Sequence, residues 1–224
     1  MPSKKTNRTI IIGDLHGCYL ELLDLLDLIN YQKSYDKIIF TGDLINRGPD
    51  SVKSIEFLVD HNCLSVMGNH EYYLIQAVDQ KKHDWDIYQH MSKEFGTSFM
   101  KLISLLRKLP LWINKNNFLL IHAGFNVGTP LEKTDPEVLT NIRQVPQKQG
   151  NLIPWFDLYH EKKPVVFGHW AKLGGVIRQN VIGLDVGCVY GGKLRAVIFP
   201  SREIAEVPAH KTYLPIKLKP KYNL

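Results

Sequence analysis

The sequence predicts an α/β fold, and three observations lead to that prediction. The first half alternates short β-branched runs with segments whose apolar residues recur at three- and four-residue intervals, as in alternating strands and amphipathic helices. The second half consists mainly of short apolar runs broken by Gly, Asn or Pro, which indicates strands joined by turns. Five of the expected strands end in a polar residue, as strands do when they lead into a binding site.

The first half supplies three expected strands and three expected helices. The strands are residues 9–12, 37–40 and 64–67, and the helices are residues 19–30, 50–61 and one that begins at 71–78. In the first helix, Leu22, Leu25 and Ile29 fall on one face. In the second, Pro49 and Asp50 stand near the start, where helix-initiating residues are common. The order is therefore βαβαβα.

The second half is expected to be mostly strand. Residues 79–97 are polar and mixed, and we interpret them as a reduced cap, followed by a helix at 99–109. The expected strands after it are residues 111–114, 117–123, 164–168, 180–185 and 194–199. No internal repeat or linker marks a boundary, so we expect residues 1–224 to form a single domain.

Composition and charge narrow the class of protein. A chain of 224 residues with 44% hydrophobic and 22% charged residues can bury a full core and is not of disordered type. The net charge of +6 and pI near 9.1 would suit nucleic acid, anionic lipid or a polyphosphate, although many basic proteins bind none of these. Because no apolar run approaches the roughly 20 residues of a membrane span, we expect no membrane partner, and we expect no nucleic-acid partner either.

The cysteines indicate a reducing compartment. Cys18, Cys63 and Cys188 are odd in number and have neither zinc-finger nor thioredoxin spacing. The three isoleucines near the start are too few for a signal-peptide core. We therefore expect a cytoplasmic protein.

The ends of the expected strands hold the candidate site. Ligands of open α/β sheets collect at the carboxyl ends of strands, and here those ends carry carboxylate, amide and imidazole groups, usually beside a Gly. Six possible metal ligands would converge there: Asp14, His16, Asp43, Asn69, His122 and His169. Six mixed ligands are too many for one tetrahedral zinc but suit two divalent ions roughly 3.5–4 Å apart.

Each of these residues taken alone has a simpler explanation. A single His is often half-buried for packing, and an Asp beside Gly is common in turns. The remaining histidines fit that explanation: His61, His83, His90, His160 and His210. The metal hypothesis depends on the combination, since four histidines that each follow a strand and a Gly or Asp are an improbable coincidence.

Five sequence blocks resemble one known superfamily. The blocks "GDLHG", "GDLINRGP", "GNHE", "IHAG" and "FGHW" resemble, in order, the signature of the phosphoprotein-phosphatase-like, calcineurin-type metallophosphoesterases. The resemblance runs from Ile12 to about Val197, and five ordered blocks are far more specific than one. It implies an αββα sandwich of two mixed β-sheets flanked by helices.

The resemblance also implies residue roles. Asp14 and His16 would hold one metal, Asp43 would bridge, and Asn69, His122 and His169 would complete the second site; the ions would be manganese foremost, or cobalt, iron or zinc. His70 would be the general acid. Arg47 would bind phosphate through its planar guanidinium, and Arg143, within "VLTNIRQ", would be a second clamp or else a surface residue.

Asn46 separates branches of this superfamily. The protein-phosphatase branch usually has Asp at the matching position, which keeps the catalytic His charged, and Asn cannot supply that charge. Together with "FGHW", Asn46 favours the symmetrical dinucleoside tetraphosphatase branch, whose nucleoside diphosphate leaving group needs less proton assistance. The segment "GLDVGCVYGGKLRAV" resembles that branch but discriminates poorly.

The expected function is therefore metal-dependent hydrolysis of dinucleoside polyphosphates, with diadenosine tetraphosphate giving two ADP. The alternatives are a bacterial-type serine/threonine protein phosphatase, a broad phosphoesterase, or a metal-free nucleotide-binding module, against which the intact ligand set argues. A Rossmann site fits less well, because "IIIGDLHG" lacks two of its glycines.

Some aromatic residues could stack on a base or simply pack in the core: Trp170, Tyr190 and one of Tyr72 and Tyr73. We expect a monomer or weak oligomer.

Overall fold

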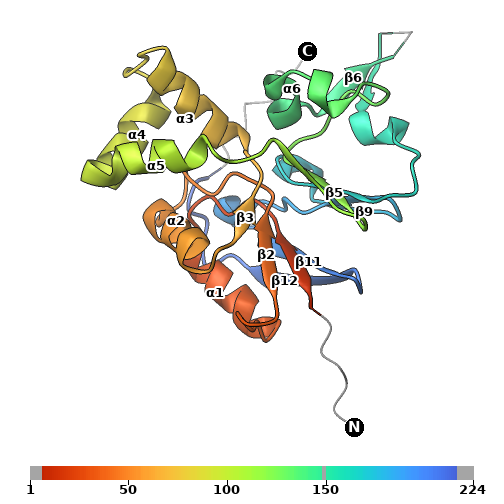
Figure 1. The fold of residues 1–224 in the computed structure, drawn as a ribbon, viewed down its shortest axis with the longest axis horizontal. Helices are drawn as coiled ribbons and strands as arrows, with labels where there is room; N and C mark the ends of the chain where they lie inside the picture. Colours follow the sequence, from red (N-terminus) through yellow and green to blue (C-terminus); the bar gives the residue numbers. More distant parts are fainter. Residues whose placement is uncertain (1–6, 148–149, 216–224) are drawn as a thin grey trace, which may run out of the picture.

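Two five-stranded sheets form the centre of the computed structural model, which describes residues 7–147 and 150–215. The first sheet has the order β12-β11-β1-β2-β3, and the second has the order β4-β5-β8-β10-β9 (Figure 1). The first contains β1 (Thr9–Ile12), β2 (Lys37–Phe40), β3 (Leu64–Ser65), β11 (Lys193–Phe199) and β12 (Glu203–Pro208). The second contains β4 (Trp112–Asn114), β5 (Leu119–Ile121), β8 (Val165–Phe167), β9 (Val176–Ile177) and β10 (Val181–Gly183).

Both sheets are mixed, as the superfamily resemblance implied. In the first, β1, β2 and β3 are parallel, whereas β11 runs antiparallel to both β1 and β12. In the second, β5, β8 and β10 are parallel, and β4 and β9 are antiparallel edge strands. The parallel strands end at the same edge of each sheet, so the residues that follow them can meet.

Strand β1 shows how the two sheets bury their faces. Ile11 packs with Leu120 and Val166 in a core between the sheets. Ile10 and Ile12 point the other way, into the core beneath the helices. Because successive side chains of a strand face opposite sides, a strand covered on both faces is apolar throughout, which explains the run TIII.

The helices cover the outer faces of the sheets. They are α1 (Tyr19–Leu28), α2 (Ser51–Asp60), α3 (Asn69–Asp79), α4 (Asp86–Phe95), α5 (Phe99–Leu106) and α6 (Pro136–Asn141). Helices α3, α4 and α5 lie together on one side of the molecule, and α6 lies on the other side of the same end (Figure 1). None of the helices described is long and apolar enough to cross a bilayer.

Shorter elements complete the fold. Strands β6 (Gln144–Pro146) and β7 (Leu152–Pro154) pair as an antiparallel ribbon beside α6. The 3₁₀ turns are η1 (Gly96–Ser98), η2 (Leu131–Lys133), η3 (Trp155–Leu158), η4 (Ala171–Leu173) and η5 (Cys188–Tyr190).

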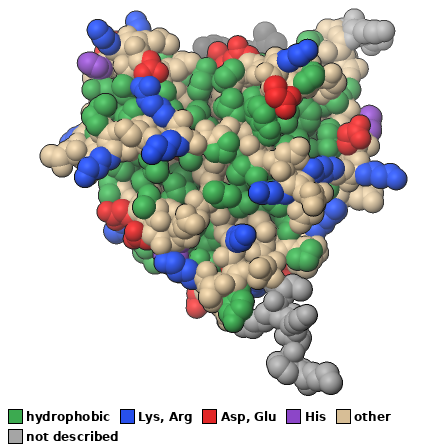
Figure 2. Space-filling model, in the orientation of Figure 1, with side chains coloured by type: hydrophobic (Ala, Val, Ile, Leu, Met, Phe, Trp, Pro, Cys, Tyr) green, Lys and Arg blue, Asp and Glu red, His purple; other side chains and the backbone are tan. Residues whose placement is uncertain are grey.

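On the face seen in Figure 2, lysines and arginines are spread between apolar and polar side chains and do not gather in one patch.

Several elements differ from the sequence expectation. The polar stretch 79–97 contains helix α4, which buries only Met91 and Phe95 fully and therefore gives a weak apolar pattern. Strand β3 ends at Ser65, two residues early, and α3 begins at Asn69. Strands β6, β7, β9 and β12 were not expected, because two- and three-residue strands and exposed edge strands carry little periodicity.

Candidate active site

All six expected ligands and His70 meet at one edge of the two sheets. Asp14 and His16 follow β1, Asp43 follows β2, Asn69 and His70 begin α3, His122 follows β5, and His169 follows β8. Every one of these side chains is at most 9% exposed. Buried polar groups in such number at one place have to satisfy one another or a ligand.

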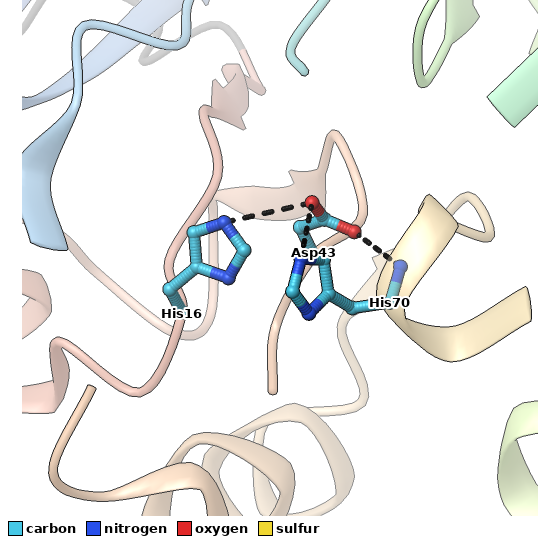
Figure 3. A group of neighbouring side chains, drawn as sticks. All are labelled: His16, Asp43 and His70. Carbon is cyan, nitrogen blue, oxygen red and sulfur yellow. Dashed lines mark hydrogen bonds and ion pairs between the residues drawn. The ribbon is translucent and has the colours of Figure 1, made fainter. Parts of the chain in front are cut away.

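Asp43 is at the centre of this group. His16 Nε2 lies 3.5 Å and His70 Nε2 4.0 Å from Asp43 Oδ2, and the backbone N–H of His70 donates to Asp43 Oδ1 over 2.9 Å (Figure 3). On the other side, His122 Nε2 lies 3.6 Å from Asp43 Oδ1. Two sets of ligand atoms, each mutually within 4.8 Å, share this aspartate: His16, Asp43 and His70, and Asp43, His122 and His169. Asp43 is thus the residue that the two sets have in common.

In the second set, the ring nitrogens that carry lone pairs point toward the side-chain oxygen of Asn69. His122 Nδ1 donates to the carbonyl of Thr41 over 2.7 Å, so its neutral ring presents the lone pair of Nε2. That lone pair faces Asn69 Oδ1 at 3.1 Å as well as the carboxylate of Asp43. His169 repeats the arrangement: Nε2 donates to the carbonyl of Asn141 over 3.0 Å, and Nδ1 faces Asn69 Oδ1 at 2.9 Å. Several acceptors turned toward one point are what a cation requires.

Both carboxylate oxygens of Asp14 already accept hydrogen bonds from the protein. Its Oδ1 accepts from the Thr41 hydroxyl over 2.7 Å, and its Oδ2 accepts from the backbone N–H of His169 over 2.7 Å. Among the described residues, Asp14 belongs to neither of the two ligand sets that contain Asp43. It lies beside the site, where burial and then the charges of Asp185 and Asp43 raise the pKa of Asp14 well above its ordinary value.

Asp185 is a site residue that the sequence interpretation missed. It follows β10, is 8% exposed, accepts from the N–H of Gly187 over 3.0 Å and interacts with Asp14. The signal was present, because Asp185 ends the expected strand 180–185 just as the other candidates follow theirs. Asp185 lies outside the five superfamily blocks, so the resemblance implies no role for it.

Glu71 is the second missed residue, and it shapes the Asp43 turn. Its Oε2 accepts from the N–H groups of Asp43 and Gly68 over 2.8 and 2.9 Å, and its Oε1 accepts from the N–H of Leu44 over 2.9 Å. Burial raises the pKa of Glu71 to about 7. A carboxylate that receives several backbone donors fixes the loop on which Asp43 sits.

The backbone around the site is strained. Five non-glycine site residues have positive φ: His16 (47°), Asp43 (48°), Asn46 (70°), Arg47 (73°) and His169 (65°). Such conformations cost free energy and persist where the surrounding structure holds side chains in a functional position.

The electrostatics of the site favour cations. Burial raises the pKa of Asp43 to about 7. Burial and the charges of neighbouring carboxylates raise the pKa of Asp14 well above its ordinary value. Burial lowers the pKa of His16 to about 3 and that of His122 to about 4. Neutral imidazoles and crowded carboxylates are the protonation states and charges that divalent cations stabilise, so the residues present fit a pair of metal ions.

Two arginines lie at the mouth of the site. A cavity of about 500 Å³ is lined by Arg47 and Arg143 together with His169, Trp170, Ala171, Lys172, Asp185, Tyr190, Leu214 and Pro215. Arg47 Nη1 is 3.1 Å from His16 Nε2, and its guanidinium lies 5.6 Å from the centre of the Tyr190 ring. Arg143 is within 3.5 Å of the His169 carbonyl. Both guanidinium groups are therefore next to the ligand set and open to an anionic substrate.

The aromatic candidates divide into two groups. Trp170 and Tyr190 line the cavity and are partly exposed. Tyr72 and Tyr73 are not among its lining residues, and the Tyr73 hydroxyl instead donates to Asn141 Oδ1 over 2.8 Å, joining α3 to α6. Tyr73 thus has a structural contact. Of the aromatic candidates, Trp170 and Tyr190 are the ones that line the cavity where a base could stack.

The two mixed sheets, the helices outside them and this strand-end cluster of carboxylates, amide and imidazoles define a metal-dependent phosphoesterase. The family model described as calcineurin-like phosphoesterase matches residues 8–199, and the chain belongs to that family. The family implies divalent metal ions, which the clusters around Asp43 are suited to hold.

Individual relatives narrow the comparison. The chain is 29% identical to a symmetrical bis(5'-nucleosyl)-tetraphosphatase of Vibrio parahaemolyticus, over 88% of this chain and 97% of that protein. It is 27% identical to the protein of the same name from Methylobacillus flagellatus, over 90% and 95% of the two chains. A solved structure provisionally named as a diadenosine tetraphosphatase superposes with a TM-score of 0.80 at 32% identity, covering 92% of this chain and 95% of that one.

More distant structures share the fold alone. A yeast protein serine/threonine phosphatase superposes with a TM-score of 0.64 at 14% identity, over 93% of this chain. Identity this low carries no information on substrate.

Proposed function

We propose that this protein is a dinuclear-metal phosphohydrolase that cleaves dinucleoside polyphosphates, converting diadenosine tetraphosphate into two ADP. The observation that carries the proposal is the cavity in which Arg47 and Arg143 adjoin the Asp43 ligand sets. It suits a substrate with several linked phosphates, since one phosphorus can sit at the ligands while neighbouring phosphates meet the guanidinium groups. The full-length similarity to proteins named symmetrical tetraphosphatases supports the same substrate class.

The proposed ligands are Asp14 and His16 for one ion, Asp43 as the bridge, and Asn69, His122 and His169 for the other. When bound, such a metal pair lowers the pKa of a water and neutralises phosphoryl charge. The position of Asp185 beside Asp14 suggests that it supports this ligand set. We propose manganese as the native ion, with cobalt, iron or zinc as alternatives, because mixed oxygen and imidazole ligands suit borderline cations.

The remaining roles belong to groups that touch the substrate. Arg47 and Arg143 bind the phosphate oxygens and hold the reacting phosphorus near Asp43. His70, whose Nε2 faces the site at 4.0 Å from Asp43 Oδ2, gives a proton to the departing oxygen. Trp170 and Tyr190 contact the nucleoside.

The proposal extends to the protein's context. Residues 1–224 act as one metallophosphoesterase domain, as monomer or weak oligomer, in the cytoplasm, on a small nucleotide substrate. It includes no nucleic-acid or membrane partner. The match of the family model to residues 8–199 supports the single domain.

The second candidate is a bacterial-type serine/threonine protein phosphatase or broad phosphoesterase, since membership of the calcineurin-like phosphoesterase family leaves these activities open. Product analysis separates the candidates. The enzyme with manganese is incubated with diadenosine tetraphosphate and, separately, with phosphoserine peptides, and products are identified by chromatography. The proposal expects ADP as the main product and far higher kcat/KM for the dinucleotide. ATP plus AMP would exclude symmetrical cleavage, and faster phosphopeptide turnover would favour the second candidate.

A further inference from the structure

The segment after the last strand, residues 209–215, lies against the loop that carries Tyr190. The N–H of Ala209 donates to the carbonyl of Gly192 over 2.9 Å. Farther along, the N–H groups of Tyr213 and Leu214 both donate to the carbonyl of Val189, over 3.1 and 3.0 Å. These contacts bring Leu214 to the cavity that holds the two arginines.

A buried carboxylate of α1 anchors this segment. Glu21 is fully buried, and its Oε1 accepts from the backbone N–H of His210 over 2.8 Å and from the Tyr213 hydroxyl over 2.7 Å. His210 Nε2 also lies 2.5 Å from Asp24 of the same helix. Because a buried acceptor that loses its donors is costly, Glu21 fixes the segment at two points instead of leaving it to solvent.

The loop and the segment fit closely. Gly191 has φ +88°, and a Cβ at that position would lie 2.4 Å from Thr212 Oγ1. Only glycine permits this approach without a shift of either the loop at Gly191 or the segment at Thr212. The backbone behind Tyr190 therefore rests directly on the segment, and the two form one side of the cavity.

The lining of the cavity combines charged and apolar side chains. Arg47 and Arg143 adjoin the ligand sets, and Trp170, Leu214 and Pro215 give part of the wall an apolar surface. Trp170 is supported from behind by Phe156, with ring centres 6.2 Å apart. Leu214 is 40% exposed and lines the same cavity as the two arginines. Phosphate gains nothing from such a wall, but a nucleobase has flat apolar faces that do.

We propose that residues 209–215, held by Glu21, form a wall of the nucleotide subsite, and that Leu214 and Pro215 cover a nucleobase whose phosphates bind Arg47 and Arg143. The proposal rests on the nucleotide hydrolase function above and deepens it. It assigns discrimination between nucleotides and base-free phosphates to a segment that lies outside the five superfamily blocks.

The test compares ligands with and without a base. ADP and pyrophosphate are titrated calorimetrically, with manganese present, into the wild type, Leu214→Ala and a matched control, Leu28→Ala. Leu28 is 55% exposed at the end of α1 and is not among the residues that line the cavity. The wild type and the control are expected to prefer ADP over pyrophosphate. Leu214→Ala is expected to reduce that preference by about 3–10-fold, the effect of losing part of one leucine's apolar contact.

A second variant tests the anchor. Tyr213→Phe keeps the ring and removes the hydroxyl that donates to Glu21, so the preference for ADP should fall in the same direction but by less. An unchanged preference in Leu214→Ala, or equal losses for ADP and pyrophosphate, would overturn the proposal. A phosphoserine peptide that binds more tightly than ADP and loses affinity in Leu214→Ala would overturn the assignment to a nucleobase.

A different experimental result would reject the proposed function. Wild-type enzyme that leaves diadenosine tetraphosphate intact while it hydrolyses phosphopeptides would reject that function. The ADP and pyrophosphate titrations need no turnover, so they report on the wall in either case.

Discussion

The side-chain amide of Asn46 donates a hydrogen bond to Nδ1 of His70 over 2.9 Å. The direction is fixed because Asn46 Oδ1 accepts from the N–H of Arg47 over 2.8 Å, which leaves the amide nitrogen to face the imidazole. His70 Nδ1 is therefore the acceptor, and the neutral ring carries its proton on Nε2, the nitrogen nearest Asp43. Asn46 supplies no charge to this pair but sets which nitrogen of His70 holds the proton.

Replacing Asn46 with Asp should change substrate preference. A carboxylate can only accept, so it would require a proton on Nδ1 and would raise the pKa of His70, which burial and then the neighbouring His16 hold well below its ordinary value. We expect Asn46→Asp to raise kcat/KM for alkyl phosphoesters more than for diadenosine tetraphosphate, because an alkoxide needs a stronger proton donor. The alkaline limb of the kcat profile should move to higher pH.

The measurement is kcat/KM for both substrate classes across pH, in wild type and Asn46→Asp. Asn46→Ser, which removes the amide without adding charge, serves as the control and should lower both activities. Equal gains or equal losses for the two substrate classes in Asn46→Asp would contradict the role given to position 46.

Replacing His70, the proposed general acid, should leave the metal site intact, because His70 is not among the proposed ligands even though its ring lies within one of the two sets around Asp43. We expect His70→Asn to retain two metal ions per chain but to lose roughly 10²–10⁴-fold in kcat, the usual contribution of general acid–base catalysis. The loss should shrink for substrates with better leaving groups, such as p-nitrophenyl esters. Metal analysis and a leaving-group series check this, and a loss independent of the leaving group would assign His70 another role.

Replacing Asp43, the proposed bridge, should be more severe. Asp43 belongs to both ligand sets, so Asp43→Asn is expected to abolish turnover and to reduce bound metal while the fold survives. Atomic absorption on the purified variant, with circular dichroism as the fold control, tests this expectation. Near-normal metal content together with a near-normal rate would rule out a dinuclear centre built on Asp43.

Much of the site was predictable because it sits where regular structure ends. The apolar runs that lead to Asp14, Asp43 and His122 locate strands. The first two strands are parallel neighbours in one sheet, so their ends lie together, whereas the strand before His122 is parallel to β8 in the other sheet. The αββα architecture followed from the superfamily resemblance rather than from periodicity, which gives no information on how two sheets pack. The assignment of roles to these residues remains a prediction.

The parts that escaped prediction depend on contacts distant in sequence. Glu21 lies on an ordinary amphipathic helix, and only the fold shows that its carboxylate meets Tyr213, 192 positions away. Glu71 was quoted as part of a motif, yet its bonds to the Asp43 turn appear only in three dimensions. Helix α4 was obscured by the polar composition of a segment that buries few side chains.

The stability of the metal-free protein should depend on pH in a way that bound metal reduces. Burial raises the pKa of Asp43 and of Glu71 to about 7 in the folded chain, from ordinary values of 3.8 and 4.5. The folded state then holds protons that the unfolded chain has released, so this stabilisation is present at acid pH and is lost as pH rises through about 7. His16 and His122, whose pKa values are lowered to about 3 and about 4, act in the opposite sense, but only below the ordinary imidazole value of 6.5.

The window in which the carboxylates dominate therefore runs from pH 6.5 to about 8, and there the chelator-treated enzyme should lose stability as pH rises. We expect its melting temperature to fall by about 2–8 °C across this window, the effect of one to two kcal/mol in a chain of this size. With manganese, Asp43 as a proposed ligand should be held ionised, so the fall should shrink to the part contributed by Glu71, which is not among the proposed ligands. Glu71→Gln should reduce the fall in the metal-free enzyme, because it removes one of the carboxyl groups whose pKa is raised by burial, whereas Glu132→Gln, at an exposed position, should not. Thermal unfolding at several pH values with and without manganese decides the matter: a metal-free melting temperature that rises from pH 6.5 to 8 would mean that Asp43 and Glu71 ionise without cost in the folded chain.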